Sequence, residues 1–380
     1  MSGDHANPLG DQCLTIESDT AVQSLGERRI VGAGNFLNAQ SQKKNRIRKL
    51  AFLVLAILVW ASTSSAQDSF SQPSLLNPAA EPAAGILDFG LLVIWICLGI
   101  FIVVFGALVF TLIQFRAKPG DEEKEPPQVY GSEQLELAWT IIPILIVIVL
   151  GLITAGRIFV LQKTEPPPES LAIRIVGHQW WWELQYEDYD FITANELHLP
   201  VNQVAFLDLE SQDVIHSFWV PQLSGKTDLV PNRVNHMWIE PHETGLFVGQ
   251  CAEYCGTQHA HMLLRVFVHT EEDFEKWVAD QKKEARRVAS VQAGRETFEQ
   301  TACINCHTVR GVTEIGQFGP DLTHLMSRTT IGAGAAANDR ENLITWITDP
   351  DHFKPGARMP AMKLDESEIR QVADYLMTLK

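Results

Sequence analysis

Twelve consecutive residues, Cys251–Met262, hold an unusually large group of side chains that could do chemistry together. They supply two thiols, two imidazoles, one thioether and one carboxylate. Soft sulfur ligands combined with imidazole suit copper. Cys251 and Cys255 are close in sequence, and Gly256 permits a tight turn directly after them. This stretch, called the copper loop below, can therefore bring both sulfurs to one metal site.

Two other chemistries fit the copper loop taken alone. Cys251 and Cys255 could form a disulfide in an oxidising compartment. Two cysteines with two histidines could also hold zinc in a four-ligand site. Met262 and the upstream histidine His216 add further donors of the kind that copper prefers. Taken without further context, the loop leaves copper, zinc and a disulfide open.

A second motif lies closer to the C-terminus, at Cys303–His307 (CINCH). The pattern C-x-x-C-H is typical of covalent attachment of a c-type haem. In this pattern Cys303 and Cys306 form thioethers with the haem, and His307 ligates the iron. The pattern C-x-x-C-H also occurs by chance, so the residues that follow it are needed to judge whether it attaches a haem.

That context resembles a small all-helical cytochrome c of class I. Gly319–Leu322 (GPDL) follows the motif, then Arg358–Pro360 (RMP), then a predicted C-terminal helix containing Tyr375–Leu376. The resemblance implies that Met359 is the second iron ligand, and a histidine–methionine pair raises the haem potential. The other candidate methionines, in order, are Met362 and Met326.

The composition limits the choice of partners. With 380 residues the chain is long enough for two or three domains, and its formal net charge of −16 argues against nucleic-acid binding. Four of the six cysteines lie in the two motifs, which leaves Cys13 and Cys97. This usage indicates cofactor chemistry and not a disulfide framework.

Residues 1–66 are interpreted as a polar N-terminus followed by a signal peptide. Basic residues cluster in Lys43–Lys49, an apolar run extends from Leu50 to Trp60, and small residues fill Ala61–Ala66. This order is typical of a secretory signal, and the apolar run is shorter than the ~20 residues that a spanning helix needs. Cleavage is expected where the small residues end, and an uncleaved anchor is the alternative. Residues 67–84 are interpreted as a Ser/Pro/Ala-rich linker.

Two long apolar runs predict a transmembrane hairpin over residues 85–162. The runs are Ile86–Phe115 and Leu137–Ala155, and Pro143 is expected to break the second helix. The basic side chains of the intervening loop are Arg116, Lys118 and Lys124. The positive-inside rule places this loop in the cytoplasm, and the signal peptide agrees because it leaves both mature ends outside.

Residues 169–270 predict an all-β sandwich behind the stiff spacer Pro166–Pro168. Short apolar segments alternate with Pro and Gly over roughly a hundred residues, which is the size of a sandwich domain. The expected strands are 171–176, 204–209, 234–239, 246–249 and 263–268. The copper loop opens where one of these strands ends and closes where the next begins.

Three further segments, together with the copper loop, resemble subunit II of cytochrome c oxidase. They are Asp213–Pro221 (DVIHSFWVP), Gly177–Glu183 (GHQWWWE) and Glu136–Pro143 (ELAWTIIP). The resemblance implies a cupredoxin-like sandwich that holds a binuclear copper centre. The implied ligands are Cys251 and Cys255 as bridges, His216 and His259 as terminal ligands, Met262 as the weak axial ligand and the backbone carbonyl of Glu253. His261 is left as a non-ligand, and Ala252 stands where the family commonly has serine.

The resemblance also implies roles outside the copper ligands. Trp180 would be the residue through which electrons enter, and Glu136 would stand at the entrance of a proton path, with Glu133 as a competitor. Alternatively, a carboxylate at the start of a helix can serve only to stabilise the helix by its interaction with the helix dipole. The carboxylate of Glu253 would help to hold magnesium at the contact with subunit I.

Two features concern the approach of a cytochrome. Between Glu165 and Asp213 there are ten acidic residues and one basic residue, Arg174, a balance suited to docking a basic cytochrome. Residues 271–290 predict a charged helical linker after a capping box at Thr270. This linker would tether the cytochrome c domain, residues 291–380.

These observations predict subunit II of a bacterial respiratory cytochrome c oxidase with a fused cytochrome c domain. Electrons would pass from a donor, such as a cytochrome c or a bc-type complex, to the haem, then to the copper pair, then to subunit I, where oxygen reduction drives proton pumping. The expected partners are subunit I, other oxidase subunits and membrane lipid, with both cofactor domains on the periplasmic face of the plasma membrane. The alternatives are the copper-containing subunit of a nitric oxide reductase and a membrane-anchored copper-binding or copper-delivery protein.

Overall fold

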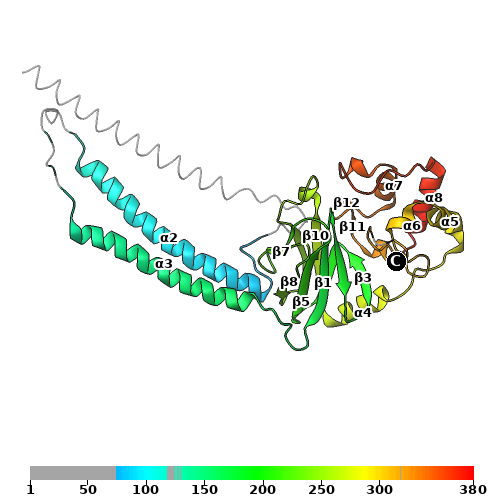
Figure 1. Cartoon of the computed structure of the whole chain (residues 1–380), viewed down its shortest axis with the longest axis horizontal. Helices are drawn as coiled ribbons and strands as arrows, with labels where there is room; N and C mark the ends of the chain where they lie inside the picture. Colours follow the sequence, from blue (N-terminus) through cyan, green and yellow to red (C-terminus); the bar gives the residue numbers. More distant parts are fainter. Residues whose placement is uncertain (1–73, 118–124, 126–127, 129, 317) are drawn as a thin grey trace, which may run out of the picture. The chain divides into compact units, whose positions relative to one another are not determined.

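The computed structural model of the chain describes residues 74–117, 125, 128, 130–316 and 318–380. The predicted signal peptide, residues 1–66, lies outside the described residues, as does most of the loop between the two apolar runs. In chain order the described part contains two long helices, a sandwich of two sheets and a small, mainly helical C-terminal domain (Figure 1).

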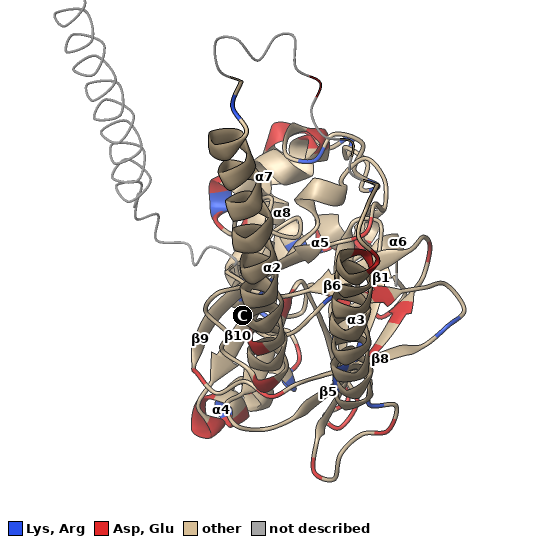
Figure 2. Cartoon of the chain, turned by 90° about the vertical axis from the view of Figure 1, so that its left-hand side faces the viewer, with Lys and Arg blue, Asp and Glu red and all other residues tan. Residues whose placement is uncertain are grey.

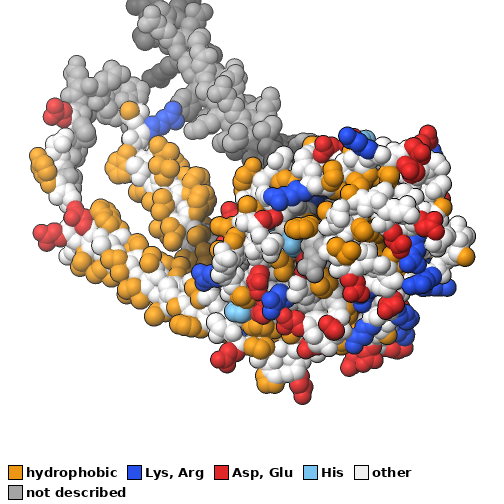
Figure 3. Space-filling model, turned by 45° about the vertical axis from the view of Figure 1, so that its right-hand side comes forward, with side chains coloured by type: hydrophobic (Ala, Val, Ile, Leu, Met, Phe, Trp, Pro, Cys, Tyr) orange, Lys and Arg blue, Asp and Glu red, His pale blue; other side chains and the backbone are white. Residues whose placement is uncertain are grey.

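The two apolar runs form helices α2 (Glu81–Gln114) and α3 (Glu133–Leu161). Both exceed the ~20 residues that span a bilayer, and few of the residues between their ends are charged (Figure 2). Apolar side chains cover their outer surface (Figure 3), as lipid-facing helices require. The predicted break at Pro143 is wrong, because α3 continues through it. A proline removes only one backbone donor, and spanning helices tolerate this loss.

The predicted linker 67–84 ends in residues that belong to the sandwich. Ala79 N donates to Gln222 O at 2.8 Å, and His242 N donates to Ala79 O at 2.8 Å. Ala79 and Ala80 are buried in the core of the sandwich, and helix α2 already begins at Glu81. The first membrane helix is thus anchored directly on the globular part.

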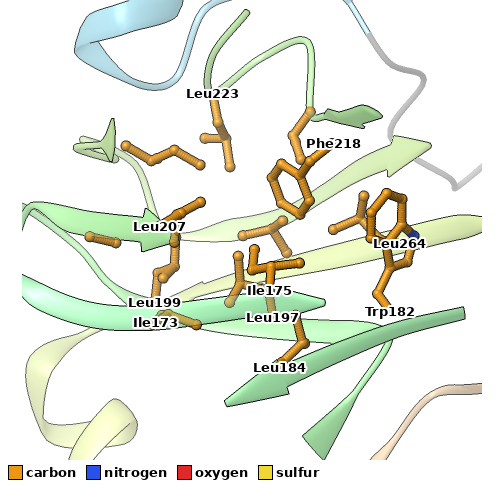
Figure 4. Packing of buried hydrophobic residues seen from close by; sticks show 14 of the residues in the cluster. Ile173, Ile175, Trp182, Leu184, Leu197, Leu199, Leu207, Phe218, Leu223 and Leu264 are labelled. Atoms are coloured by element: carbon orange, nitrogen blue, oxygen red, sulfur yellow. The ribbon is translucent and has the colours of Figure 1, made fainter. Parts of the chain in front are cut away.

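The sandwich consists of two five-stranded sheets with the orders β3-β2-β1-β5-β8 and β4-β10-β9-β6-β7. The strands are β1 (Leu171–His178), β2 (Trp181–Tyr186), β3 (Phe191–Ala194), β4 (Glu196–Pro200), β5 (Ala205–Ser211), β6 (His216–Trp219), β7 (Thr227–Leu229), β8 (Asn235–Ile239), β9 (Gly245–Cys251) and β10 (Leu263–His269). Pairs β1–β5 and β4–β10 are parallel, and the other pairs are antiparallel. Side chains such as Ile175, Leu197 and Phe218 meet between the sheets (Figure 4).

Helix α4 (Glu271–Gln281) closes one side of the sandwich. Thr270 caps it by accepting a hydrogen bond from Asp273 N at 3.2 Å. Phe274 and Val278 are buried in the core of the sandwich, and Trp277 stacks on His198 with ring centroids 4.1 Å apart. The helix is therefore part of the sandwich core.

The predicted helical linker 271–290 is wrong beyond Gln281, where α4 ends. The charged residues that follow provide no apolar stripe that a further helical turn could bury. The segment after α4 instead forms hydrogen bonds with the C-terminal domain. Ala285 N donates to Arg310 O at 3.1 Å, and the Arg310 side chain donates to Gln281 O. This connection is held at both ends and is not a free tether.

The C-terminal domain packs four helices around one core. They are α5 (Gln292–Gln300), α6 (Cys303–Cys306), α7 (Arg340–Thr348) and α8 (Glu366–Leu376), and a two-stranded hairpin, β11 (Thr330–Ile331) and β12 (Ala336–Ala337), lies between them in sequence. Phe298 of α5 meets Tyr375 of α8 with ring centroids 5.6 Å apart. Helix α8, predicted around Tyr375–Leu376, begins with a capping box from Asp365 to Glu368.

Candidate functional site

The copper loop lies at one end of the β4-β10-β9-β6-β7 sheet. Strand β9 ends at Cys251, and β10 begins one residue after Met262. Hydrogen bonds from Cys251 N to Met262 O and from Ala252 N to Ser217 O, both 2.9 Å, hold the two ends of the loop against each other and against β6. Strand β6 starts at His216, so this histidine reaches the same end of the sheet.

Four of the predicted donor atoms converge on the two sulfurs. The Cys251 and Cys255 Sγ atoms are 3.7 Å apart. Cys251 Sγ lies 4.0 Å from His216 Nδ1 and 3.2 Å from the Glu253 carbonyl oxygen. Cys255 Sγ lies 3.8 Å from His259 Nδ1 and 3.9 Å from Met262 Sδ. The four donors and the two sulfurs predicted from the sequence therefore lie together at this end of the sheet.

The separation of the sulfurs bears on the alternatives for this loop. A disulfide has a bond of about 2.05 Å, so Cys251 and Cys255 are two free cysteines and the disulfide interpretation is wrong. A four-ligand zinc site would use two cysteines and two histidines, whereas this site also presents a thioether and a carbonyl. Soft sulfur in excess of imidazole fits copper better. His261 lies outside the set, with its Nδ1 2.7 Å from Gln258 Oε1.

The site is almost closed to solvent, and its electrostatics favour a thiolate. His216 is 0% exposed, Cys251 3% and Cys255 2%. The hydrogen bond from the Cys255 thiol, with a further one from His216, lowers the pKa of Cys251 to about 3, although burial opposes this. The same hydrogen bond raises the pKa of Cys255. Binding a metal between the two sulfurs must therefore displace the proton that they share.

A carboxylate that the sequence reading did not single out orients His216. His216 Nε2 lies 2.8 Å from Asp213 Oδ1, so Nε2 donates and Nδ1 remains free on the side of the sulfurs. Burial would lower the pKa of His216, but the hydrogen bonds with Asp213 and Cys251 raise it. The signal was present in the sequence, because Asp213 precedes His216 by three residues within the quoted motif.

A glycine makes room for the same histidine. A Cβ atom at Gly177 would lie 2.8 Å from His216 Cδ2 and 3.2 Å from Leu229 Cδ2. Neither neighbour can move easily, because both are fully buried and His216 is also bonded to Asp213. The backbone of β1 thus forms one wall of the metal site.

We expect Gly177→Ala to displace His216 and to weaken copper binding by about 10- to 100-fold, the usual effect of disturbing the groups that orient a metal ligand. Copper titration followed by visible absorption measures this. The control is Arg174→Ala on the same strand, whose side chain pairs with Glu187 and Glu210 at the surface. Equal copper affinity of the Gly177 variant and the wild-type chain would contradict the wall assigned to Gly177.

The segment Gly177–Glu183, which contains three tryptophans, contacts the copper loop from the other sheet. Gln179 Nε2 and Trp180 Nε1 both donate to the Cys255 carbonyl oxygen, at 2.8 and 3.0 Å. Gly256, with φ of +117°, allows this approach, because a Cβ there would lie 3.0 Å from Gln179 Nε2 and 3.1 Å from the Trp180 ring. Trp180 is half-buried, whereas Trp182 is fully buried and packs against His216 and Phe218.

The haem motif places its histidine in a defined orientation. His307 Nδ1 donates to Pro320 O at 2.8 Å, which leaves Nε2 for an iron. Burial lowers the pKa of His307, so the imidazole is neutral, as a metal ligand has to be. Cys303 and Cys306 are half-buried at α6. Two thiols and an oriented neutral imidazole fit a covalently attached haem.

The predicted second iron ligand, Met359, lies in the segment between α7 and α8. Its Sδ accepts a hydrogen bond from Trp346 Nε1 at 3.1 Å. Of the other candidates, Met362 accepts from Leu364 N through its carbonyl, and Met326 N donates to Leu379 O beside the chain end. Trp346 is a contact that the sequence reading missed, since it lies thirteen residues before Met359.

The carboxylates with predicted roles lie away from the sulfurs. Glu133 and Glu136 occupy the first turn of α3 and are exposed. The side chain of Glu253 is 44% exposed and lies 3.9 Å from Lys226 Nζ, while its carbonyl faces Cys251. The carboxylate of Glu253 is thus open to a partner outside the sandwich.

Comparison with known protein families gives three matches in chain order. Residues 70–155 match "Cytochrome C oxidase subunit II, transmembrane domain". Residues 191–268 match "Cytochrome C oxidase subunit II, periplasmic domain". Residues 291–380 match "Cytochrome c".

Individual relatives carry matching names. "Cytochrome c oxidase subunit 2" of Alkalihalophilus pseudofirmus is 38% identical over 312 residues, which cover 80% of this chain and 90% of that protein. The protein of the same name from Bacillus subtilis is 32% identical over 327 residues, covering 81% and 92%. The crystal structure of the periplasmic domain of subunit II (CoxB) of Bradyrhizobium japonicum is 34% identical, with a TM-score of 0.30, and the match covers 30% of this chain and 96% of that one.

Proposed function

The chain belongs to the family of cytochrome c oxidase subunit II, with a cytochrome c domain fused at its C-terminus, and from this premise we propose that it passes electrons from its own c-type haem to a binuclear copper centre. It is a subunit of a haem–copper terminal oxidase that binds copper and haem and associates with the other oxidase subunits at a membrane. The oxygen-reducing site lies in another subunit.

The copper assignment has one main support, which is the convergence of four further donor atoms on two sulfurs 3.7 Å apart. Two coppers sharing Cys251 and Cys255 would spread the charge of one electron over both metals, so that little geometry has to change. The chain's part is to fix the ligands beforehand. Asp213 orients His216, and the Cys255 carbonyl is bonded from Gln179 and Trp180. Fixed ligands of this kind keep the reorganisation during electron transfer small.

The haem assignment places one covalent haem on Cys303 and Cys306, with His307 and Met359 as iron ligands. The neutral imidazole of His307 is held by Pro320 O, and the thioether of Met359 by Trp346 Nε1. A histidine–methionine pair gives a haem potential high enough to accept electrons from a cytochrome c or a bc-type complex. These are the donors that we propose.

The proposed membrane arrangement is supported by the length and apolar composition of α2 and α3. We propose that both helices cross the bacterial plasma membrane with their connection in the cytoplasm, and that the sandwich and the haem domain lie on the periplasmic face. Glu136, at the start of α3, then lies near the cytoplasmic side, where a proton path into subunit I can begin. The exposed carboxylate of Glu253 would face subunit I, where it can help to hold magnesium.

Substrate consumption tests the proposed function. The purified oxidase complex should consume oxygen with a reduced cytochrome as donor, and its haem spectrum should include a covalent c-type haem on this subunit. Consumption of nitric oxide in place of oxygen would point to the reductase alternative. A subunit with copper but no covalent haem would point to the copper-delivery alternative.

A further inference from the structure

Two patches of polar contacts join the C-terminal domain to the sandwich beside other hydrogen bonds such as Leu263 N to Ala333 O, and the second patch reaches the copper loop. The first patch is a buried carboxylate. Glu196 of β4 is 1% exposed, and it accepts hydrogen bonds from Thr329 N at 2.9 Å and Thr330 N at 3.0 Å, as well as from both threonine hydroxyls. Arg265 Nη1 donates to Thr330 Oγ1 at 3.0 Å beside it.

The second patch is the segment Lys354–Arg358, which directly precedes Met359. Lys354 Nζ donates to Trp180 O at 2.8 Å and to Gly332 O at 2.9 Å. Pro355 O accepts from Gln258 Nε2 at 2.6 Å, and the Arg358 guanidinium donates to Gln179 Oε1. On the sandwich, these contacts fall on Gln258 of the copper loop and on Gln179 and Trp180, which bond to the Cys255 carbonyl.

Lys354 is unusual because it is a lysine at a domain contact that is only 4% exposed. A buried ammonium costs free energy unless its donors are satisfied, and here two carbonyls, one from each domain, accept from it. Burial lowers the pKa of Lys354 to about 7. Within the described residues, Lys354 makes no salt bridge to a carboxylate. The ammonium therefore joins the C-terminal domain to the backbone of Trp180, next to the copper loop.

Together these contacts form a continuous connection between the two cofactor sites. From Met359 the backbone leads to Arg358, whose side chain bonds Gln179, and Gln179 Nε2 bonds the Cys255 carbonyl at 2.8 Å. A parallel branch leads from Lys354 through Trp180 to the same carbonyl at 3.0 Å. Tunnelling falls off steeply with distance, and hydrogen bonds shorten the path through space.

On the basis of the proposed function, we propose that Lys354 and Arg358 are positioning residues that hold the haem domain in its electron-transferring contact, and that the electron reaches Cys255 through Gln179 and Trp180 while the domain stays docked. The haem held by His307 and Met359 would supply one electron, changing from ferrous to ferric, and the copper pair held by Cys251 and Cys255 would accept it. No covalent bond forms or breaks in this step, and no proton is transferred. An external donor then has to reduce the haem, because the chain's own haem domain occupies the contact at Gln179 and Trp180.

The experiment uses the full-length subunit with both cofactors. Lys354→Met and Arg358→Met remove the donors and keep much of the side-chain length. Lys363→Met is the matched control, an exposed lysine of the same domain. Haem-to-copper transfer is measured after flash reduction of the haem. Hydrogen exchange of the backbone amides of 177–182 and 254–258 is measured on the same samples.

We expect the double variant Lys354→Met/Arg358→Met to slow transfer at least 10-fold and to speed amide exchange in both segments, with the haem and copper spectra unchanged. Lys363→Met should change neither readout. Unchanged transfer and unchanged amide protection in the double variant would overturn the proposal.

A second variant covers the case in which the double variant does not fold. Gln179→Leu lies in the sandwich and removes the bonds to Arg358 and Cys255 together. It should slow transfer while Trp180 stays in place, and an unchanged rate would overturn the route through Gln179. Absence of a copper-pair spectrum in the wild-type chain would reject the copper assignment and not the docking, because amide exchange reports docking without metal.

Discussion

Cys251→Ser should remove the copper centre while the sandwich remains folded. Cys251 Sγ faces Cys255 Sγ, His216 Nδ1 and the Glu253 carbonyl, so its loss takes away a ligand that both metals would share. A hydroxyl is a poor replacement, because it is a hard ligand and stays protonated at neutral pH. We expect copper binding to fall by at least 100-fold and the visible thiolate bands to disappear.

The chain offers two controls for this variant. Cys97→Ser changes an exposed cysteine of α2, and His261→Asn changes the histidine that is bonded to Gln258 and lies outside the donor set. Both should bind copper as the wild type does, by metal analysis and absorption. If His261→Asn lost copper and Cys251→Ser retained it, His261 would be a copper ligand and Cys251 would not.

Met359→Ala should keep the covalent haem and lower its potential. Cys303 and Cys306 are untouched, so attachment through the thioethers remains. Loss of the methionine ligand should lower the potential by on the order of 0.1 V or more, within the roughly 0.8 V over which axial ligands set haem potentials. The absorption band that arises from methionine–iron ligation should vanish, and electron transfer to the copper site should slow as a consequence.

Met362→Ala is the matched control, since Met362 lies three residues further along the same segment. Its haem potential and absorption should match those of the wild type. If Met362→Ala loses the methionine band and Met359→Ala keeps it, Met362 is the iron ligand.

Local patterns accounted for much of the fold and for the donor set. The strands β1, β5, β8, β9 and β10 were predicted because each is a run of apolar and β-branched residues. The copper donors were predicted because five of the six lie within Cys251–Met262, so that one loop determines their spacing. The sixth, His216, was found through its own motif.

What the sequence did not predict depends on contacts between distant segments. Strand β4 was missed because Glu196 and His198 look like surface residues, yet Glu196 is buried by Thr329 and Thr330 of the C-terminal domain. The hydrogen bond from Lys354 to Trp180 joins residues 174 positions apart. No local pattern encodes such a pair, and the linker was therefore interpreted as a tether.

The binuclear copper centre is the central claim, and paramagnetic resonance of the copper-loaded full-length subunit tests it most directly. When one unpaired electron is shared equally by two copper nuclei, its resonance signal splits into more hyperfine lines than a single copper nucleus produces. The spacing between these lines is also smaller. The geometry of Cys251 and Cys255 predicts this shared spectrum, together with two coppers per chain by metal analysis. The four-line spectrum of a single copper, or one metal ion per chain, would contradict the account.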